Sequence, residues 1–407
     1  MTLDEARALD AADPLAAMRD RFALPQDLIY LDGNSLGALP RATGAAIAEV
    51  VERQWGEQLI TSWNRHGWID APAALAAKLA PLIGAAADEV LVCDSTSINL
   101  YKLLAAALAA RPDRRTILSE RGNFPTDLYI AEGLAKQLPG VRLRTVDRAD
   151  IAAALGEDTA VLMLTHVDYC SGERHDMATL SAAASSAGAL SLWDLSHSAG
   201  ALDLSLGASG ADLAVGCGYK YLGGGPGSPA FLYVAAALQD QLHSPLSGWM
   251  GHEAPFAFDA DYRPATGIAR FLAGTPSIIA MAALAAGLAT FDSVSMREVE
   301  TKAASLTDYF IACVEERCPS LTLASPRDAA QRGSHVSFRH PHAYAVMQAL
   351  IANRVIGDVR MPDLVRFGFA PLYNSHEEAF RAAQGLGEII DGNLWDDPRY
   401  RQRAKVI

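Results

Sequence analysis

Short apolar runs rich in β-forming residues alternate along the chain with alanine-rich helical stretches. This alternation is typical of a largely parallel β-sheet with helices on both faces. We predict strands at residues 90–93, 116–119, 142–146, 160–164, 189–193, 213–217 and 231–234. We predict helices between them at residues 97–110, 124–137 and 177–187. The pattern therefore indicates an α/β fold.

Polar residues follow four of these strands, at the point where each strand ends. These polar segments are residues 94–97, 123–127, 165–166 and 194–197. In open α/β sheets, ligands bind beyond the carboxyl ends of the strands. We therefore expect one pocket at that edge of the sheet.

Lys220 lies between an apolar strand and a glycine-rich turn, downstream of Asp194. A lysine amine forms a Schiff base with the aldehyde of pyridoxal phosphate (PLP), and an upstream carboxylate keeps the pyridine nitrogen of that cofactor protonated. Taken singly, Lys220 is explained as a surface lysine and Asp194 as a turn residue. Together, each behind an apolar strand, they favour a PLP site.

The composition narrows the possible partners. The chain has 407 residues, of which 50% are hydrophobic and 20% charged, as in globular enzymes with two or three domains. Its formal charge of −13 argues against nucleic acid and anionic membrane surfaces, which need clustered Lys and Arg. The longest apolar stretch, residues 277–291, is too short to cross a bilayer. The acidic N-terminus resembles no targeting peptide, so we expect a cytoplasmic enzyme.

The five cysteines include no C-x-x-C pair, which argues against a disulfide framework and a zinc site. We expect most of them to be small buried hydrophobic residues and expect no metal. They are Cys93, Cys170, Cys217, Cys313 and Cys318.

The character of the sequence changes after Thr275 and Pro276. A long helical stretch leads there into a shorter mixed segment that ends in a helix near residues 377–390. We predict a helical N-terminal arm without a sheet over residues 1–55. A large domain over residues 56–285 and a small α+β domain over residues 286–407 follow.

Six motifs, in order along the chain, resemble those of the kynureninase family. They are YLDGNSLG (30–37), FPTD (124–127), WDLSHSAG (193–200), YKYLGGGPG (219–227), PLSGW (245–249) and RFGFAPLY (366–373). The resemblance extends from about residue 28 to residue 390. It implies a PLP-dependent transferase fold of type I, class V-like, and a homodimer with composite active sites. It also implies hydrolysis of the Cβ–Cγ bond of L-kynurenine to anthranilate and L-alanine in tryptophan degradation, with 3-hydroxykynurenine as a second substrate.

The resemblance assigns the cofactor phosphate to Thr96, Ser97 and Tyr219. The first two begin a predicted helix, where backbone N–H groups and the helix dipole favour an anion. A plain helix N-cap is the other explanation for this pair, and both can hold. The family also implicates the tyrosine that matches Tyr219 in acid–base chemistry, so Tyr219 is predicted to serve twice.

Four further residues are expected around the cofactor ring. Phe124 is expected to stack on the ring, with Asp127 and Thr165 nearby. His197 follows Asp194 by three residues and is expected to orient that carboxylate or the ring oxygen, or to be a structural histidine. Asp194 is expected to have a lowered pKa beside the pyridinium, and Lys220 to act as the base at the substrate α-carbon.

Substrate binding requires a cation for the α-carboxylate, and the planar guanidinium of arginine suits it. By the resemblance, Arg366 fills this role and Trp63 forms an aromatic wall of the substrate pocket. Trp249 and Thr275 match residues that complete the cofactor and substrate site of the neighbouring subunit. Vertebrate members of the family carry asparagine at the Thr275 position. In this respect the chain resembles the bacterial forms, which generally prefer kynurenine over 3-hydroxykynurenine.

Two other functions remain open at this point. A cysteine desulfurase or class V aminotransferase shares Lys220 and Asp194, but a desulfurase also needs a cysteine on a mobile loop, which Cys313 and Cys318 do not fit. A nucleotide-binding protein is the second alternative, because residues 223–227 are glycine-rich. That segment lacks the G-K-[S/T] ending of a P-loop and the G-x-G-x-x-G spacing.

Overall fold

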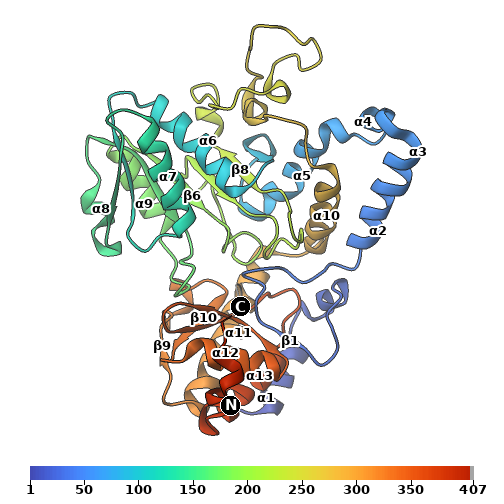
Figure 1. Cartoon of the computed structure of the whole chain (residues 1–407), viewed down its shortest axis with the longest axis vertical. Coiled ribbons are helices and arrows are strands. Elements are labelled where there is room, and N and C mark those ends of the chain that lie inside the picture. The colour runs from blue at the N-terminus through green and yellow to red at the C-terminus, as the bar shows by residue number, and fades with distance from the viewer. Residues whose placement is uncertain (404–407) are drawn as a thin grey trace.

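A seven-stranded sheet forms the centre of the larger part of the molecule (Figure 1). The computed structural model describes residues 1–403. The strands run in the order β2-β8-β7-β6-β5-β3-β4, and only β8 is antiparallel to its neighbours. They are β2 (Val90–Val92), β3 (Thr116–Glu120), β4 (Arg142–Val146), β5 (Thr159–Thr165), β6 (Leu190–Asp194), β7 (Leu213–Gly216) and β8 (Phe231–Val234). The predicted, mostly parallel sheet is therefore confirmed.

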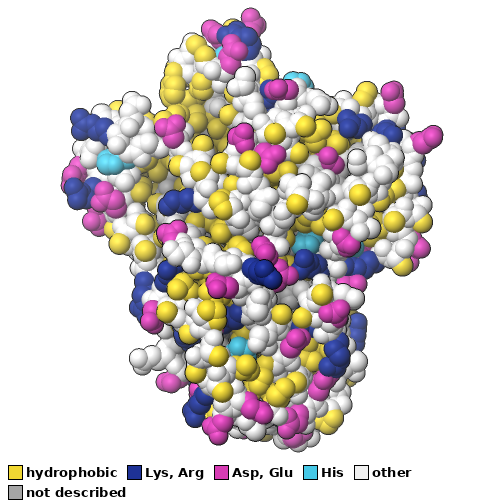
Figure 2. All heavy atoms as spheres, turned by 180° about the vertical axis from the view of Figure 1, so that it is seen from behind, with side chains coloured by type: hydrophobic (Ala, Val, Ile, Leu, Met, Phe, Trp, Pro, Cys, Tyr) yellow, Lys and Arg dark blue, Asp and Glu magenta, His cyan; other side chains and the backbone are white. Residues whose placement is uncertain are grey.

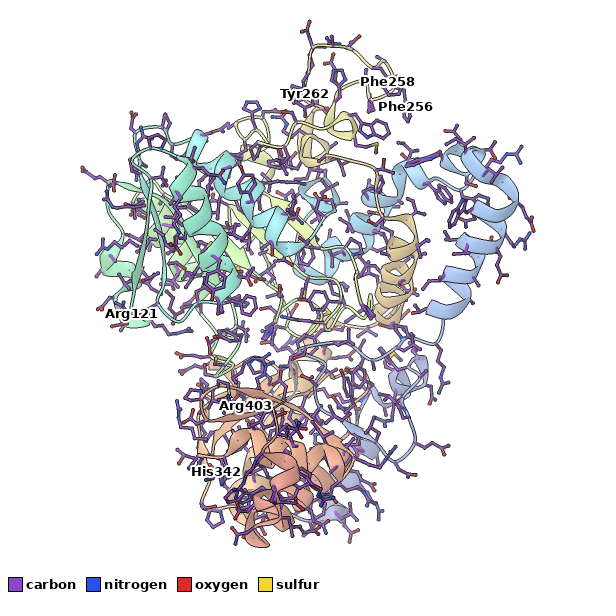
Figure 3. The ribbon with its side chains drawn as sticks, viewed as in Figure 1. Arg121, Phe256, Phe258, Tyr262, His342 and Arg403 are labelled. Atoms are coloured by element: carbon purple, nitrogen blue, oxygen red, sulfur yellow. The ribbon has the colours of Figure 1, made fainter. Side chains whose placement is uncertain are left out.

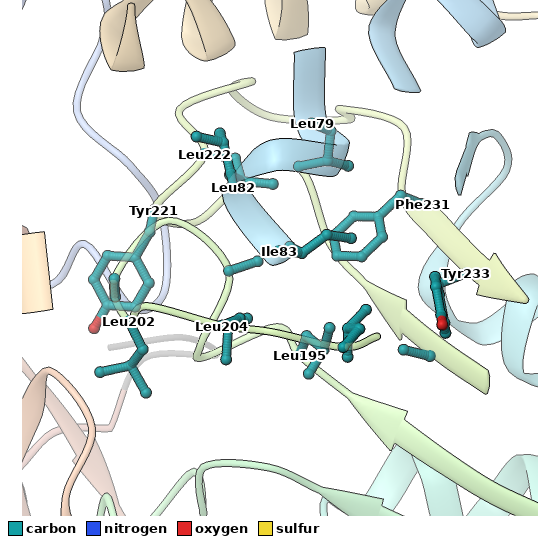
Figure 4. Packing of buried hydrophobic residues seen from close by; sticks show 14 of the residues in the cluster. Leu79, Leu82, Ile83, Leu195, Leu202, Leu204, Tyr221, Leu222, Phe231 and Tyr233 are labelled. Carbon is teal, nitrogen blue, oxygen red and sulfur yellow. The ribbon is translucent and has the colours of Figure 1, made fainter. Parts of the chain in front are cut away.

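Alternate residues of each inner strand enter two different cores, because successive side chains of a strand point to opposite faces. On β5, Val161 packs into the core beneath α6 and α7, whereas Leu162 packs into the core beneath α5, α9 and α10. Figure 4 shows Leu79 and Ile83 of the second core facing Leu195 and Phe231. The helices are α5 (Ala71–Leu79), α6 (Thr96–Ala109), α7 (Pro125–Gln137), α8 (Ile151–Ala154), α9 (Met177–Ser186) and α10 (Ile278–Leu288).

A four-stranded antiparallel sheet, in the order β12-β13-β10-β9, forms the smaller part. Its strands are β9 (Thr322–Leu323), β10 (His335–Arg339), β12 (Asp358–Arg360) and β13 (Leu364–Gly368). Helices α11 (Met296–Arg317), α12 (Ala343–Ala352) and α13 (His376–Asp391) belong to the same part of the chain. Phe310, Phe338, Phe367 and Phe369 dominate the core between them. This is the α+β arrangement predicted for the C-terminal part.

The N-terminal arm differs from its prediction, because it contributes a strand. β1 (Ile29–Tyr30) pairs in parallel with β11 (Val355–Ile356), and α1 (Leu3–Ala11) lies against α13 (Figure 1). Ala6 and Leu31 belong to the core of the smaller part, so burial of apolar side chains draws this segment onto that domain. The arm continues through α2 (Thr43–Ala48), which packs on α10, and ends in a π-helix (Glu49–Trp55). The short helices α3 (Gly56–Gln58) and α4 (Ser62–Arg65) follow it.

Two separate helices, α10 and α11, occupy the long helical stretch expected after Thr275. Their axes differ by 82°, and Ser293 in the connection has a φ of 66°. Within residues 1–403 no single helix is long and apolar enough to span a bilayer. Only the sharply bent α10–α11 pair reaches that length and composition together.

Residues 244–266 project from the large sheet domain, at the top of Figure 1. The projection begins near the short helix Trp249–Gly251 and returns through the helix Gly267–Phe271, called η9 and η10. Figure 2 shows hydrophobic side chains on the surface of this projection, with charged residues at its tip. The projection therefore exposes apolar surface away from its own core.

Candidate active site

A cavity of about 220 Å³ lies where the carboxyl ends of β5, β6 and β7 meet the start of α6 and α7. Nine predicted site residues line it, together with Thr126, Tyr169 and Ser196. The nine are Thr96, Ser97, Phe124, Asp127, Thr165, Asp194, His197, Tyr219 and Lys220. Three larger clefts, of up to 740 Å³, lie elsewhere, but no lysine lines any of them. Schiff-base chemistry therefore points to the smaller cavity.

The register of the sheet brings the polar strand ends together. Thr165 and Asp194 are the last residues of β5 and β6 and lie directly opposite each other. At the start of α6, Ser95 is the N-cap, and its hydroxyl accepts a hydrogen bond from the Ile98 N–H at 3.4 Å. Ser95 therefore caps the helix, and Thr96 and Ser97 contribute to the cavity.

Two buried carboxylates share the cavity. Asp194 accepts a hydrogen bond from the Ser196 N–H at 2.7 Å, and Asp127 accepts one from the Thr165 hydroxyl at 3.2 Å. Burial raises the pKa of Asp194, and burial followed by the negative charge of Asp194 raises the pKa of Asp127 well above its usual value. We expected the pKa of Asp194 to be lowered beside a pyridinium, but with the protein groups alone it is raised. Two carboxylates beside one lysine leave the cavity short of positive charge, which fits a cofactor with a protonated ring nitrogen.

Burial lowers the pKa of Lys220 and so favours the neutral, nucleophilic amine. The Lys220 Nζ lies 5.9 Å from the centre of the Tyr219 ring. Gly37 of the arm packs on this turn, where its N–H donates to the Tyr219 carbonyl at 2.9 Å. A Cβ at Gly37 would overlap the Lys220 carbonyl oxygen. The glycine therefore lets the arm close over the lysine turn.

Aromatic side chains form one wall of the cavity. The Phe124 ring meets the Tyr169 ring edge to face, with 5.2 Å between the ring centres. Tyr169 was not predicted from the sequence, although it follows the polar end of β5 by four residues, which is the available signal. The Phe124 N–H donates to the Asn123 side-chain oxygen at 2.8 Å, and this bond fixes the start of α7.

His197 is almost fully buried, and burial holds its pKa well below the usual value, so the ring is neutral. Its Nδ1 has no hydrogen-bond partner among residues 1–403. The His335 ring of β10 meets it edge to face at 5.1 Å between ring centres. Sequence reasoning missed His335 because 138 positions separate the two histidines (335 minus 197). The smaller part of the molecule thus contacts a residue of the cavity wall.

Arg366 does not line the cavity but lies directly behind Tyr169. Its guanidinium is fully buried and forms two hydrogen bonds with the Asp358 carboxylate, one of them from Nε at 2.6 Å. It also donates to the Tyr169 carbonyl oxygen and, at 3.1 Å, to the Ser35 hydroxyl. The predicted substrate-binding arginine is therefore already ion-paired, with Asp358 as a partner that the sequence did not reveal.

Besides Arg366, three predicted site residues do not line this cavity. Trp63 on α4 packs edge to face on Trp68 at 6.0 Å between ring centres. Trp249 contacts two aromatic rings of the projection, and Thr275 is exposed just before α10. Roles for these three residues remain predictions.

The two cysteines weighed as a desulfurase nucleophile, Cys313 and Cys318, do not supply a reactive thiol. Cys313 is buried within α11, and burial raises the pKa of its thiol. Cys318 is also buried, and burial raises its pKa to about 11. Both thiols therefore stay protonated at neutral pH, unlike the nucleophile that a desulfurase requires.

Comparisons with known proteins agree on the family and the fold. Residues 299–386 match the family described as the kynureninase C-terminal domain. The chain is 52% identical over 413 residues to a kynureninase of Burkholderia mallei (strain SAVP1), covering 100% of this chain and 99% of that protein. It is 51% identical, with the same coverage, to a kynureninase of Pseudomonas fluorescens.

Among solved structures, a cysteine desulfurase from Thermococcus onnurineus NA1 is similar, with a TM-score of 0.77 and 22% identity. The match covers 92% of this chain and 98% of the desulfurase. A mutant of the protein C-DES, with glycine covalently linked to its PLP cofactor, has a TM-score of 0.78 and 20% identity, over 90% of this chain and 98% of C-DES. At such identities the structural matches establish the fold alone. That fold is the PLP-dependent type I fold.

Proposed function

The chain belongs to the kynureninase family, and on that premise we propose that the cavity around Lys220 is the site of its reaction. The protein is a PLP-dependent hydrolase that cleaves the Cβ–Cγ bond of L-kynurenine. We assign anthranilate and L-alanine as products, in tryptophan degradation. The main support for this site is that Lys220 and the buried carboxylates of Asp127 and Asp194 line the same cavity.

The cofactor has a binding residue for each of its parts. Lys220 would hold the aldehyde carbon, Asp194 the ring nitrogen and Phe124 the ring face. Thr96 and Ser97 at the start of α6 would hold the phosphate, with Tyr219. When bound, PLP withdraws electrons from the carbon atoms next to its imine nitrogen.

The protein groups of the cavity are suited to moving protons. Because burial lowers the pKa of Lys220, its released amine can accept the proton of the substrate α-carbon. Burial also raises the pKa of Tyr219, so its phenol remains protonated and can donate a proton. Tyr219 is partly exposed, which lets it follow the substrate during the later steps.

Arg366 is our candidate for the substrate carboxylate. Asp358 occupies the Nε side of the guanidinium, and Nη1 faces the Tyr169 carbonyl in the cavity wall. The positive charge of Arg366 also contributes to the lowered pKa values of Lys220 and His197. In this role Nη1 would exchange the Tyr169 carbonyl oxygen for an oxygen of the substrate carboxylate.

We propose a homodimer with composite active sites. Large apolar side chains are exposed just after the arm and on the projection, and exposed apolar surface of this kind is typical of an interaction site. They include Leu59 (61% exposed), Ile60 (75%), Phe256 (60%) and Phe258 (75%). Figure 3 labels Phe256 and Phe258 on the outer part of the projection, whereas the Tyr262 hydroxyl turns back and donates to the Gly251 carbonyl at 3.0 Å. A second copy of the chain would cover them and receive Trp249 and Thr275.

All five cysteines are unpaired, which supports our proposal of a reducing, cytoplasmic location. The activity is tested by incubating the PLP-loaded protein with L-kynurenine and following the blue fluorescence of anthranilate. 3-Hydroxykynurenine serves as the competing substrate, and we expect slower turnover with it. A protein that binds PLP but releases no anthranilate would refute the proposed function.

A further inference from the structure

Lys102 is a completely buried lysine in the middle of α6. Its ammonium donates hydrogen bonds to the Asp94 carboxylate and, at 2.7 Å, to the Phe271 carbonyl oxygen. The sulfur of Cys93 lies 3.8 Å away. A buried ammonium is costly unless its donors are satisfied, and here two of its acceptors lie on segments 177 positions apart (271 minus 94).

The first segment is the turn between β2 and α6. Asp94 has a φ of 48°, in the left-handed region that residues other than glycine rarely adopt. The next residue, Ser95, caps α6, and Thr96 and Ser97 then enter the cavity. The bond from Lys102 to the Asp94 carboxylate therefore holds the strained residue two positions before Thr96, where the proposed phosphate site begins.

The second segment carries the residues proposed for the partner's site. Phe271 ends η10 and is fully buried, and Thr275 follows it by four positions. Between them, the Ala273 carbonyl accepts a hydrogen bond from the Met250 N–H at 3.2 Å, which ties Trp249 to the same segment. The bond from Lys102 to Phe271 therefore anchors both Trp249 and Thr275 to α6.

We propose that Lys102 is a positioning residue that couples the two active sites of the dimer. At one end it holds the turn that presents Thr96 and Ser97 to its own cofactor, and at the other it holds the segment that presents Trp249 and Thr275 to the partner. The inference rests on the proposed composite sites. Lys102 itself touches neither cofactor nor substrate.

Two variants separate this role from core packing. Lys102→Met keeps the length and burial of the side chain but removes the charge and both hydrogen bonds. Asp94→Asn removes only the ionic contact and leaves the bond to the Phe271 carbonyl. Asp94 is partly exposed, so water can solvate the altered group, and this variant keeps the test available if Lys102→Met does not fold.

The first readout is PLP affinity, measured by titrating each cofactor-free variant with PLP and following the absorbance of the lysine-bound cofactor. A disturbed turn should raise the Kd for PLP about tenfold in both variants. Kynurenine KM, at saturating PLP, should rise only in Lys102→Met. A role in packing alone would lower the melting temperature without separating the two variants.

Two heterodimers, each with a single working pocket, show whether Lys102→Met acts on the pocket of its own chain or on that of the partner. In the first, a Lys102→Met chain is paired with a Lys220→Ala chain, so the working pocket has the altered turn and natural partner residues. In the second, a natural chain is paired with a Lys102→Met, Lys220→Ala chain, so the working pocket has the natural turn and receives Trp249 and Thr275 from the altered chain. A natural chain paired with Lys220→Ala is the reference.

We expect the first heterodimer to show the raised Kd for PLP with a kynurenine KM close to the reference. The second should show the reference Kd for PLP and a KM raised about threefold or more. If the kynurenine KM of the second heterodimer equals that of the reference, the proposed coupling is wrong. It is also wrong if both heterodimers show the same changes in PLP Kd and kynurenine KM.

A further control tests the premise separately. Placing Trp249→Ala and Thr275→Ala in the Lys220→Ala chain of the reference should abolish its activity. If activity persists, the composite site of the proposed function fails, and the coupling fails with it. If activity is lost while the second heterodimer equals the reference, only the role of Lys102 fails.

Discussion

The carboxyl groups of Asp127 and Asp194 lie in one cavity, each less than 5% exposed, and the charge of Asp194 adds to the burial that raises the pKa of Asp127. Two adjacent buried carboxylates repel each other, so a cation between them is strongly favoured. A protonated pyridine nitrogen is such a cation. The acidic pair therefore gives the proposed cofactor site an electrostatic reason to bind PLP in its ring-protonated form.

Asp194→Asn should fold and bind kynurenine, yet slow turnover by about 10²-fold or more, because a neutral amide does not hold the ring nitrogen protonated. KM should change much less than kcat. Steady-state assays with anthranilate fluorescence measure both. Asp127→Asn is the matched variant and should lower kcat less, since Asp127 is bound to the Thr165 hydroxyl and is not the residue assigned to the ring nitrogen. An unchanged kcat in Asp194→Asn would rule out the assignment.

Lys220→Ala should lose the visible absorbance of lysine-bound PLP. Its kcat should fall by roughly 10²–10⁴-fold or more, the range for removal of a positioned acid–base group. Absorbance spectra and the anthranilate assay check both losses. Lys136→Ala is the control, because Lys136 is exposed and pairs with Glu132 on α7. Full activity of the Lys220 variant would remove this lysine from the mechanism.

Mixing inactive Lys220→Ala chains with inactive Trp249→Ala, Thr275→Ala chains should restore roughly a quarter of the natural activity. Random exchange makes half of the dimers mixed, and each mixed dimer has one intact composite site. Two different affinity tags verify that subunits exchange. If mixed dimers are isolated and remain inactive, Trp249 and Thr275 serve their own chain or its packing.

Arg366→Lys should raise the kynurenine KM more than it lowers kcat, because an ammonium cannot bind a carboxylate through two parallel bonds. Arg366→Met should instead destabilise the fold by up to about 3–5 kcal/mol, since it breaks a fully buried pair and leaves Asp358 with Arg360, at 2.9 Å, as its ionic partner. Urea denaturation measures the free energy of unfolding. The double variant with Asp358→Asn should recover part of the loss, and no recovery would show that the pair is not the cause.

Asp32 gives the fold a pH dependence of its own. Burial, and then the charge of Asp358, raise its pKa to about 7 from the usual 3.8. Between these two values the folded chain binds more protons than the unfolded chain, so stability falls as pH rises, by about 1.4 kcal/mol per pH unit. Asp32→Asn should remove this slope between about pH 4 and pH 7. Unfolding free energies at pH 5, 6, 7 and 8 test the difference, and identical slopes in both proteins would contradict it.

The strands and most of the cavity could be predicted because they depend on local patterns. β4 and β8 have the predicted bounds, and the other sheet strands differ by one residue at one or both ends. A strand whose two faces are both buried is apolar at successive positions, and such unbroken apolar runs are visible in the sequence. The polar residues at the strand ends then had to meet, because parallel strands end at one edge of the sheet.

The remaining site depends on pairings between distant segments. His335 reaches His197, and Asp358 reaches Arg366, only because the smaller domain packs against the ends of the larger sheet. The pairing of β1 with β11 likewise places the arm on the smaller domain, which the helical appearance of the arm concealed. No spacing rule in the sequence relates such partners.

The sequence by itself determined the elements, the edge of the sheet that holds the chemistry, and the family. Periodicity and motif order are local properties, and each is read within a few residues. Only the tertiary structure decided which partners the buried charges have, because the hydrogen bond of Lys102 to the Phe271 carbonyl and the ion pair of Arg366 with Asp358 depend on how separate segments pack. Burial then sets the pKa values of Lys220 and the two aspartates, since the cost of a charge depends on everything that excludes water from it.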